Sequence, residues 1–201
     1  MSRKEGLFDQ LKKPTGILGE IAGSVMAATN KEVNRWTIAQ MEISPNERIL
    51  EVGYGPGVAL DTLLNVVTHG MVSGVDHSEV MENQARRRNK AAIREGRLNL
   101  QVGDVSSLPF EDDSFTKVLV VNAFEYWDDP IAALTEIRRV MAPSANIFIA
   151  CHPRWFEENE EANAFADEIK AALGESNFHT IRVMRRKLEP ILAFCVTGFK
   201  H

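Results

Sequence analysis

Ile49-Leu50-Glu51-Val52-Gly53-Tyr54-Gly55-Pro56-Gly57 is the stretch of sequence that decides the fold. Two apolar residues, an acid and a valine lead into three glycines at alternate positions. This pattern predicts a buried strand that ends in a tight glycine loop and then opens into a helix. Glycine has no Cβ and tolerates positive φ, so the backbone can come within contact distance of a ligand. The amide dipoles of the following helix point at the same spot, and we expect a small-molecule site there.

Predicted strands and helices alternate along the rest of the chain. Strands are expected over residues 48–52, 71–75, 98–102, 115–121, 146–151, 178–184 and 190–199. Helices are expected between them, over residues 57–67, 79–95, 130–141 and 157–173. Such alternation is typical of a parallel sheet with right-handed crossovers. Residues 185–189 are too few for a parallel crossover, so the last strand is expected to run antiparallel to its predecessor.

The predicted fold class is therefore α/β. We expect a Rossmann-like, seven-stranded, mostly parallel sheet with an antiparallel last strand and helices on both faces. Two further helices are expected before the first strand, over residues 15–29 and 31–43. Residues 1–43 are interpreted as an N-terminal helical extension and a candidate lid, and residues 44–201 as the ligand-binding domain. The whole chain is expected to form one domain.

Composition narrows the class of protein. The 201 residues are 44% hydrophobic and 25% charged, with a net charge of -5, which is typical of a soluble globular chain. An acidic balance argues against a nucleic-acid partner. No uncharged run approaches the roughly 20 residues of a membrane span, and no secretory leader is evident, so a cytoplasmic protein is expected. Cys151 and Cys195 lie in apolar runs, without zinc or disulfide spacing, and no metal site is predicted.

Polar or glycine residues end four successive predicted strands. They are Gly53, Asp76, Asp104 and Asn122. Ligands of open α/β sheets bind beyond the carboxyl ends of the strands, so their coincidence indicates one site. Each residue alone also has an ordinary interpretation. Asp76 begins a sequence that matches a helix capping box, Asp104 can be a turn aspartate, and Gly53 can serve only a tight turn.

The spacing of the glycines differs from that of a dinucleotide loop. Such a loop has glycines at relative positions one, three and six, whereas Val58 occupies the sixth position here. A carboxylate at Asp76 can accept both ribose hydroxyls of a nucleoside. The carboxylate of Asp104 can accept from an exocyclic amine such as that of adenine, and the amide of Val105 can donate to a ring nitrogen.

Taken in order, the Glu51 to Gly57 loop, Asp76, Gly103-Asp104-Val105 and Asn122 resemble the motifs of class I S-adenosylmethionine-dependent methyltransferases, most closely the methyltransferase-11 type. The resemblance covers about residues 35–141 and implies S-adenosylmethionine as cofactor. By position, it assigns the following roles. Glu51 and the loop with Gly53, Tyr54, Gly55 and Gly57 would hold the methionine part of the cofactor. Asp76 would bind the ribose hydroxyls, His77 would lie beside the adenine, and Asp104 and Val105 would recognise the adenine edge. The backbone of Asn122 would lie near the methionyl amine or the sulfonium.

Catalytic residues are harder to predict, because methyl transfer needs alignment and exclusion of water more than acid–base groups. Glu125, Tyr126 and His152 are the candidates. Glu125 is also readily explained as a surface loop charge, and His152 also has an ordinary structural interpretation. Trp36, Tyr126 and Trp127 are candidate substrate contacts, although core packing is the simpler role for Trp36.

The resulting hypothesis is methyl transfer to a small-molecule acceptor. One alternative is a protein that binds S-adenosylmethionine or S-adenosylhomocysteine without transferring methyl groups and acts through an interaction surface. A second, less favoured alternative is a nicotinamide-dependent oxidoreductase. The accepting atom and the oligomeric state are not indicated by the sequence.

Overall fold

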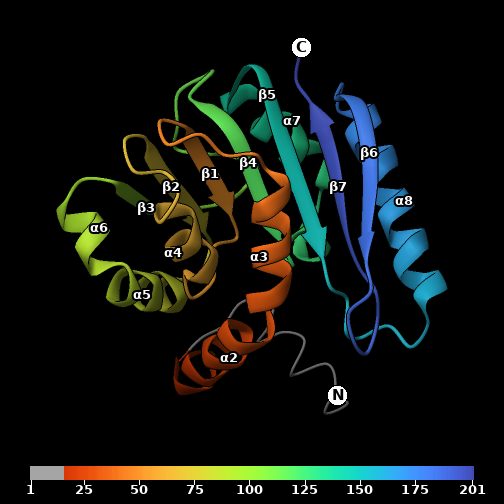
Figure 1. The fold of residues 1–201 in the computed structure, drawn as a ribbon, viewed down its shortest axis with the longest axis horizontal. Helices are drawn as coiled ribbons and strands as arrows, with labels where there is room; N and C mark the ends of the chain where they lie inside the picture. Colours follow the sequence, from red (N-terminus) through yellow and green to blue (C-terminus); the bar gives the residue numbers. More distant parts are fainter. Residues whose placement is uncertain (1–15) are drawn as a thin grey trace.

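The computed structural model describes residues 16–201, and its centre is one seven-stranded sheet in the order β3-β2-β1-β4-β5-β7-β6 (Figure 1). The strands are β1 (Arg48–Val52), β2 (Met71–Asp76), β3 (Leu98–Val102), β4 (Phe115–Val121), β5 (Met141–Cys151), β6 (His179–Arg186) and β7 (Ala193–Phe199). β1 to β5 pair in parallel, whereas β7 is antiparallel to both of its neighbours. The predicted fold class, including the antiparallel last strand, is confirmed.

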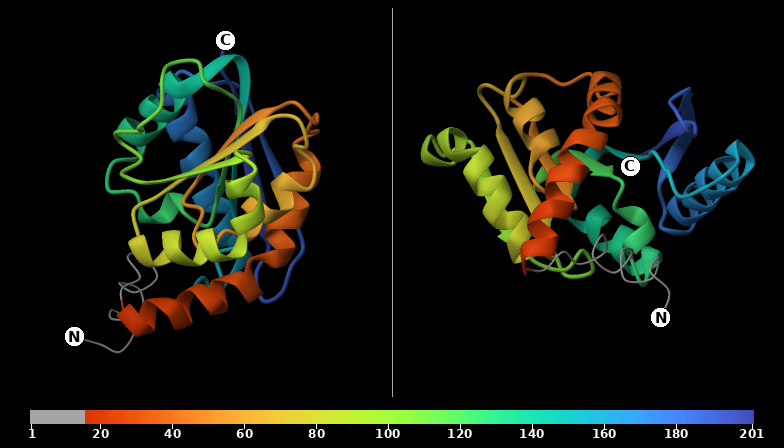
Figure 2. Two further views of the ribbon diagram at one scale, coloured as in Figure 1. Left: turned by 90° about the vertical axis from the view of Figure 1, so that its left-hand side faces the viewer. Right: turned by 90° about the horizontal axis from the view of Figure 1, so that it is seen from below.

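Helices cover both faces of this sheet (Figure 2). The helices are α2 (Gly16–Thr29), α3 (Lys31–Gln40), α4 (Val58–Leu64), α5 (Glu79–Arg88), α6 (Lys90–Arg94), α7 (Pro130–Val140) and α8 (Asn159–Glu175), and a short 3-10 turn spans Phe124–Tyr126. α3 to α6 pack on one face, and α7 and α8 on the other. None of the helices within residues 16–201 has the length and apolar character of a membrane span.

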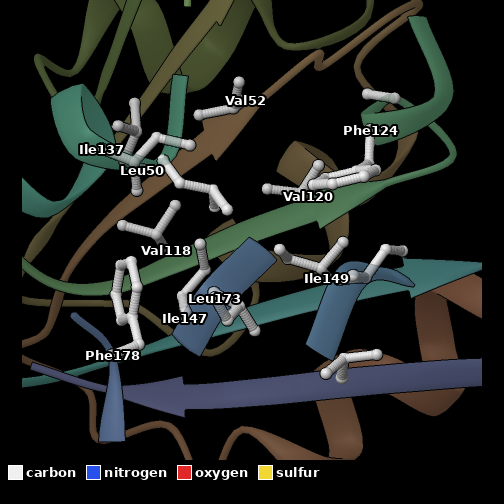
Figure 3. Close-up of a cluster of buried hydrophobic side chains, with 14 of the residues drawn as sticks. Leu50, Val52, Val118, Val120, Phe124, Ile137, Ile147, Ile149, Leu173 and Phe178 are labelled. Atoms are coloured by element: carbon white, nitrogen blue, oxygen red, sulfur yellow. The ribbon is translucent and has the colours of Figure 1, made fainter. Parts of the chain in front are cut away.

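Alternation along the central strands creates the two halves of the core. On β4, Val118 and Val120 face α7 and α8 and belong to the same core cluster as Ile137 of α7 and Leu173 of α8 (Figure 3). Leu119 belongs to the cluster under α3 and α4 on the opposite face. Because a central strand is buried on both sides, its sequence is a continuous apolar run rather than an alternating one.

Several element boundaries differ from the prediction; β5, for example, begins at Met141 rather than at residue 146. Two of the differences have a reason in tertiary contacts. The predicted helix 79–95 is divided at Asn89, whose side-chain amide donates to the carbonyls of Gly57 (3.1 Å) and Ala85 (3.0 Å). The last strand begins at Ala193 rather than Pro190, because the amide of Leu192 donates to Asn159 Oδ1 (2.9 Å) instead of to a strand.

The predicted N-terminal extension is helical where the structure describes it. Residues 1–15 of the extension lie outside the described part of the chain. α2 passes below the carboxyl edge of the sheet, which is the lower edge in Figure 1, and α3 then runs up one face. The second helix ends at Gln40, three residues earlier than expected. The element before the first strand is therefore placed beside the edge at which a ligand would bind.

Candidate functional site

A cavity of about 690 Å³ opens where β1, β2, β3 and β4 end, a size typical of small-molecule sites. The predicted site residues that line it are Gly53, Gly55, Asp76, His77, Asp104, Val105, Asn122, Tyr126 and Trp127. Apolar side chains, among them Val52, Val75 and Met81, complete its walls. The strand-end residues chosen from the sequence thus converge on one cavity.

The glycine loop is held in a left-handed backbone conformation that favours glycine. Gly53 has φ +74°, and a Cβ at this position would lie 2.5 Å from Cβ of Ala123. Gly55 has φ +50° and donates its amide to Asp76 Oδ2 at 2.8 Å. Gly57 has φ +77° and packs against Ala85 of α5, away from the residues that line the cavity. The first two glycines therefore form the cavity floor, and the third allows α4 and α5 to approach.

Asp76 is the buried carboxylate of the site, with 7% of its surface exposed. Its two oxygens accept from the amides of Gly55 (2.8 Å) and Ser78 (2.9 Å). Burial raises the pKa of Asp76, and these two hydrogen bonds oppose the rise. The capping-box interpretation of Asp76 is wrong, because Ser78 is the N-cap of α5. Asp76 instead ties the glycine loop to the start of that helix.

Glu51 and Tyr54 lie beneath the loop and do not line the cavity. Glu51 is 3% exposed, and its Oε2 has no hydrogen-bond partner among the described residues. Burial and the nearby Asp76 raise the pKa of Glu51 well above its usual range. The ring of Tyr54 packs on Gly74, and its hydroxyl donates to the carbonyl of Gln101 at 3.3 Å. Both residues support the loop from below.

The loop after β3 forms the far wall of the cavity. Asp104 is exposed, and its Oδ1 accepts from both the hydroxyl (2.7 Å) and the amide (2.8 Å) of Ser106. These hydrogen bonds, the hydroxyl first, lower the pKa of Asp104 and keep it ionised. The ordinary turn role is observed, and it leaves acceptor positions of the carboxylate open to a ligand, because a carboxylate has four of them.

Asn122 joins three segments at the other wall. It has φ +48°, its side-chain amide donates to Asn30 Oδ1 (3.0 Å), and its Oδ1 accepts from the amide of His152 (2.7 Å). Asn30 lies between α2 and α3, and His152 follows β5. The side chain of Asn122 is therefore occupied in connecting these elements, and the role expected for its backbone stays a prediction.

Glu125 is half-buried rather than exposed in a loop, and one oxygen of its carboxyl group is enclosed by the protein. Its Oε2 accepts from the thiol of Cys151 at 3.8 Å, and its Oε1 has no partner among the described residues. Burial raises the pKa of Glu125 to about 7. Burial, and then Glu125 and Cys151, also raise the pKa of Tyr126. Tyr126 and Trp127 line the cavity, while Glu125 does not.

The remaining two candidates, Trp36 and His152, line a second cavity of about 750 Å³. This cavity lies among α3, the segment after β5 and the end of β6. The predicted residues thus fall into two neighbouring places, and the hydrogen bond between Asn122 and His152 connects them.

Comparison with known proteins identifies the family. Residues 50–149 match a family model described as methyltransferase domain. A relative from Bacillus subtilis, the uncharacterized methyltransferase YdaC, is 30% identical over 181 residues, which cover 90% of this chain and 98% of that protein. The chain belongs to this methyltransferase family. The resemblance to class I S-adenosylmethionine-dependent methyltransferases is thereby confirmed, and the oxidoreductase alternative is excluded.

Solved structures agree on the fold of the methyltransferase. A chain in the complex that contains the Haloferax volcanii Trm112 methyltransferase activator aligns with a TM-score of 0.76 at 22% identity, covering 89% of this chain and 94% of that one. A SAM-dependent methyltransferase from Aquifex aeolicus aligns with a TM-score of 0.69 at 20% identity, covering 84% and 89%.

The first cavity of the methyltransferase fits its cofactor, S-adenosylmethionine. Gly53 and Gly55 leave a cradle that any Cβ would narrow, and Asp76 places a buried carboxylate beside it. No Lys or Arg is found among the described residues that line the cavity. A cofactor without phosphate groups suits such walls better than a dinucleotide does.

Sequence reasoning missed several residues of the methyltransferase site. Met26, Asp128 and Asp129 line the first cavity, and Asn30 holds Asn122. Met26 lies on α2 and Asn30 between α2 and α3, and the position of these two helices relative to the sheet is not encoded in their own residue spacing. The Asp128-Asp129 pair could have been found from the sequence, because it directly follows the candidate Trp127. Asp129 is also the N-cap of α7, and its side chain accepts from the amide of Ala132 at 2.9 Å.

Proposed function

We propose that this methyltransferase transfers the methyl group of S-adenosylmethionine to a small-molecule acceptor and binds the cofactor in the first cavity. The observation that carries the proposal is the convergence of Gly53, Asp76, Asp104 and Asn122 on that cavity. The acidic net charge of -5 supports a small molecule over a nucleic acid as acceptor. A cytoplasmic location and the absence of a nucleic-acid partner remain predictions.

Each part of the cofactor has a partner of suitable chemistry in this assignment. The carboxylate of Asp76 accepts from the ribose hydroxyls, and His77 lies beside the adenine. Asp104 and the amide of Val105 recognise the adenine edge. The backbone of Gly53, Gly55 and Asn122 borders the methionine part of the cofactor. The two glycines lack a Cβ, so the backbone can come close to the ligand there. Glu51, Tyr54 and Gly57 act indirectly, by holding the loop in shape.

When bound, S-adenosylmethionine supplies an already activated sulfonium methyl group. The protein then has to orient the acceptor in line with that group and keep water away. Tyr126 and Trp127 contribute two aromatic side chains to the cavity wall, and these suit this task. Glu125, Tyr126 and His152 remain candidates for direct contact with the acceptor or for proton transfer from it.

Isothermal titration tests the cofactor site. Asp76→Ala is expected to weaken S-adenosylmethionine binding at least tenfold, because hydrogen bonds to a charged group contribute about 1.5–3 kcal/mol. Asp61→Ala, which removes an exposed carboxylate on α4, is the matched control and should leave the affinity unchanged. Equal affinities in the two variants, with both proteins folded, would place the cofactor elsewhere.

A screen of small-molecule acceptors for release of S-adenosylhomocysteine tests the transfer itself. Turnover with one acceptor class is the expected result. Tight binding of S-adenosylhomocysteine without release in the presence of any acceptor would instead favour the alternative in which the chain binds the cofactor and acts through an interaction surface.

A further inference from the structure

The second cavity adjoins the proposed cofactor site through a single hydrogen-bonded contact. Asn122 lines the first cavity and His152 the second, and Asn122 Oδ1 accepts from the amide of His152 at 2.7 Å. The other end of the Asn122 side chain donates to Asn30, at the junction between α2 and α3. A molecule in the second cavity would therefore lie directly across Asn122 from the first.

The second cavity is positively charged although the chain is acidic. Its lining carries four cationic and two acidic side chains: Lys31, Arg35, Arg154, Arg186, Glu32 and Glu189. Arg186 pairs with Glu32 at 3.6 Å, and Arg154 donates to the carbonyl of Thr29. Lys31 and Arg35, one turn apart on α3, form no ion pair with any described residue. Two cations thus remain free to bind an anion.

His152 supplies an independent sign of a ligand at the inner end of this cavity. Its side chain is 2% exposed, and neither ring nitrogen makes a well-aligned hydrogen bond to a described residue, although the backbone of Ile191 is near enough to oppose the fall in its pKa. Burial, and then Arg154, lower the pKa of His152, so the ring is neutral and offers one donor and one acceptor. Buried polar groups without partners are rare in proteins because they cost about 1–3 kcal/mol each. A ligand in the cavity would satisfy them.

We infer that the second cavity binds the anionic group of the methyl acceptor, a carboxylate or phosphate, while the accepting atom of the same small molecule extends past Asn122 to the first cavity, where its lone pair takes the methyl group and S-adenosylhomocysteine leaves. Lys31 and Arg35 hold the anionic group at the open side, and a polar atom of the acceptor contacts His152 at the inner side, next to Asn122. The inference rests on the proposed function, because it names the substrate class of the same reaction.

Binding of simple anions tests the inference without a known acceptor. The probes are inorganic phosphate, followed by ³¹P line broadening, and acetate, followed by saturation transfer, at constant ionic strength and with the protein saturated with S-adenosylhomocysteine. We expect at least one anion to bind, and Lys31→Gln/Arg35→Gln to weaken that binding fivefold or more. Whichever anion binds more tightly identifies the anionic group as phosphate or carboxylate.

Lys90→Gln/Arg94→Gln is the matched control, because it removes the same charge from exposed positions of α6. It should leave anion binding unchanged. The inference is overturned if neither anion binds, or if the two double variants weaken binding equally, since the effect would then be one of net charge alone.

Titration with S-adenosylhomocysteine separates this inference from the proposed function. Lys31 and Arg35 do not line the first cavity, so their double variant should bind S-adenosylhomocysteine as the unmodified protein does. Normal cofactor binding without anion binding defeats the acceptor site alone. Anion binding without cofactor binding in the unmodified protein defeats the proposed function instead.

Discussion

At Gly53 a positive φ and a lack of space coincide. An alanine there would have φ +74° and a Cβ 2.5 Å from Cβ of Ala123, whereas Gly96 has φ +71° with nothing within 4 Å. We expect Gly96→Ala to cost about 1 kcal/mol through backbone strain alone. Gly53→Ala should cost about 2–4 kcal/mol, because overpacking is added. Urea unfolding measures both, and equal losses would mean that the contact with Ala123 relaxes freely.

Glu125 should make stability depend on pH. The pKa of the Glu125 carboxyl is 4.5 in the unfolded chain and about 7 in the folded protein, so between these two pH values the folded state keeps a proton that the unfolded state has lost. Its contribution to the free energy of unfolding is complete below pH 4.5 and is lost as pH rises through 7, by at most about 3 kcal/mol. Glu125→Gln is expected to remove this decline and to be the more stable protein at pH 8.

Urea unfolding between pH 5 and pH 8 measures this difference. Glu157→Gln, at an exposed position, is the control and should keep the decline of the unmodified protein. A parallel decline in Glu125→Gln would show that another buried group, such as Glu51, causes it.

Among the elements, α2 is the one placed to respond to the cofactor. Its Met26 lines the first cavity near Gly55, and its Gly23 packs closely on Gln84 of α5. We therefore expect S-adenosylhomocysteine to slow hydrogen exchange of the α2 amides several-fold, as for a lid that closes on a ligand. Mass spectrometry of proteolytic peptides measures the exchange.

Peptides from α8 are the internal control, because α8 packs on the opposite side of the sheet from α3 and lines neither cavity. Their exchange should be the same with and without the ligand. Unchanged exchange in α2, with S-adenosylhomocysteine bound, would contradict the lid hypothesis.

The elements also show how far the sequence alone could lead. Strand ends were predictable because parallel strands place their carboxyl ends at one edge, and Asp76, Asp104 and Asn122 duly meet there. The break at Asn89 was not, because it depends on a hydrogen bond to Gly57, 32 residues away. The second cavity was not predictable either, because Arg35, His152 and Arg186 become neighbours only when α3, β5 and β6 assemble.

For the whole molecule, two core clusters share one sheet, so we predict that they unfold together. Trp36 packs against the cluster under α3 and α4, and Trp127 against the cluster under α7 and α8. Two variants of a Trp155→Phe protein each keep one tryptophan. Trp127→Phe keeps Trp36, which reports on the face under α3 and α4, and Trp36→Phe keeps Trp127, which reports on the face under α7 and α8. Fluorescence midpoints in urea should coincide within each protein with the midpoint from circular dichroism. Separate midpoints would mean that the single predicted domain is two.

The insertion of β7 between β5 and β6 has a consequence for synthesis on the ribosome. In the finished sheet β6 pairs only with β7, which lies between β5 and β6. Since β7 follows β6 in the chain, α8 and β6 leave the exit tunnel before β7 does. Until β7 emerges, the open edge of β5 and the whole of β6 lack backbone partners. The interval between the emergence of β6 and that of β7 therefore sets how long these unpaired edges are exposed to chaperones and to other chains.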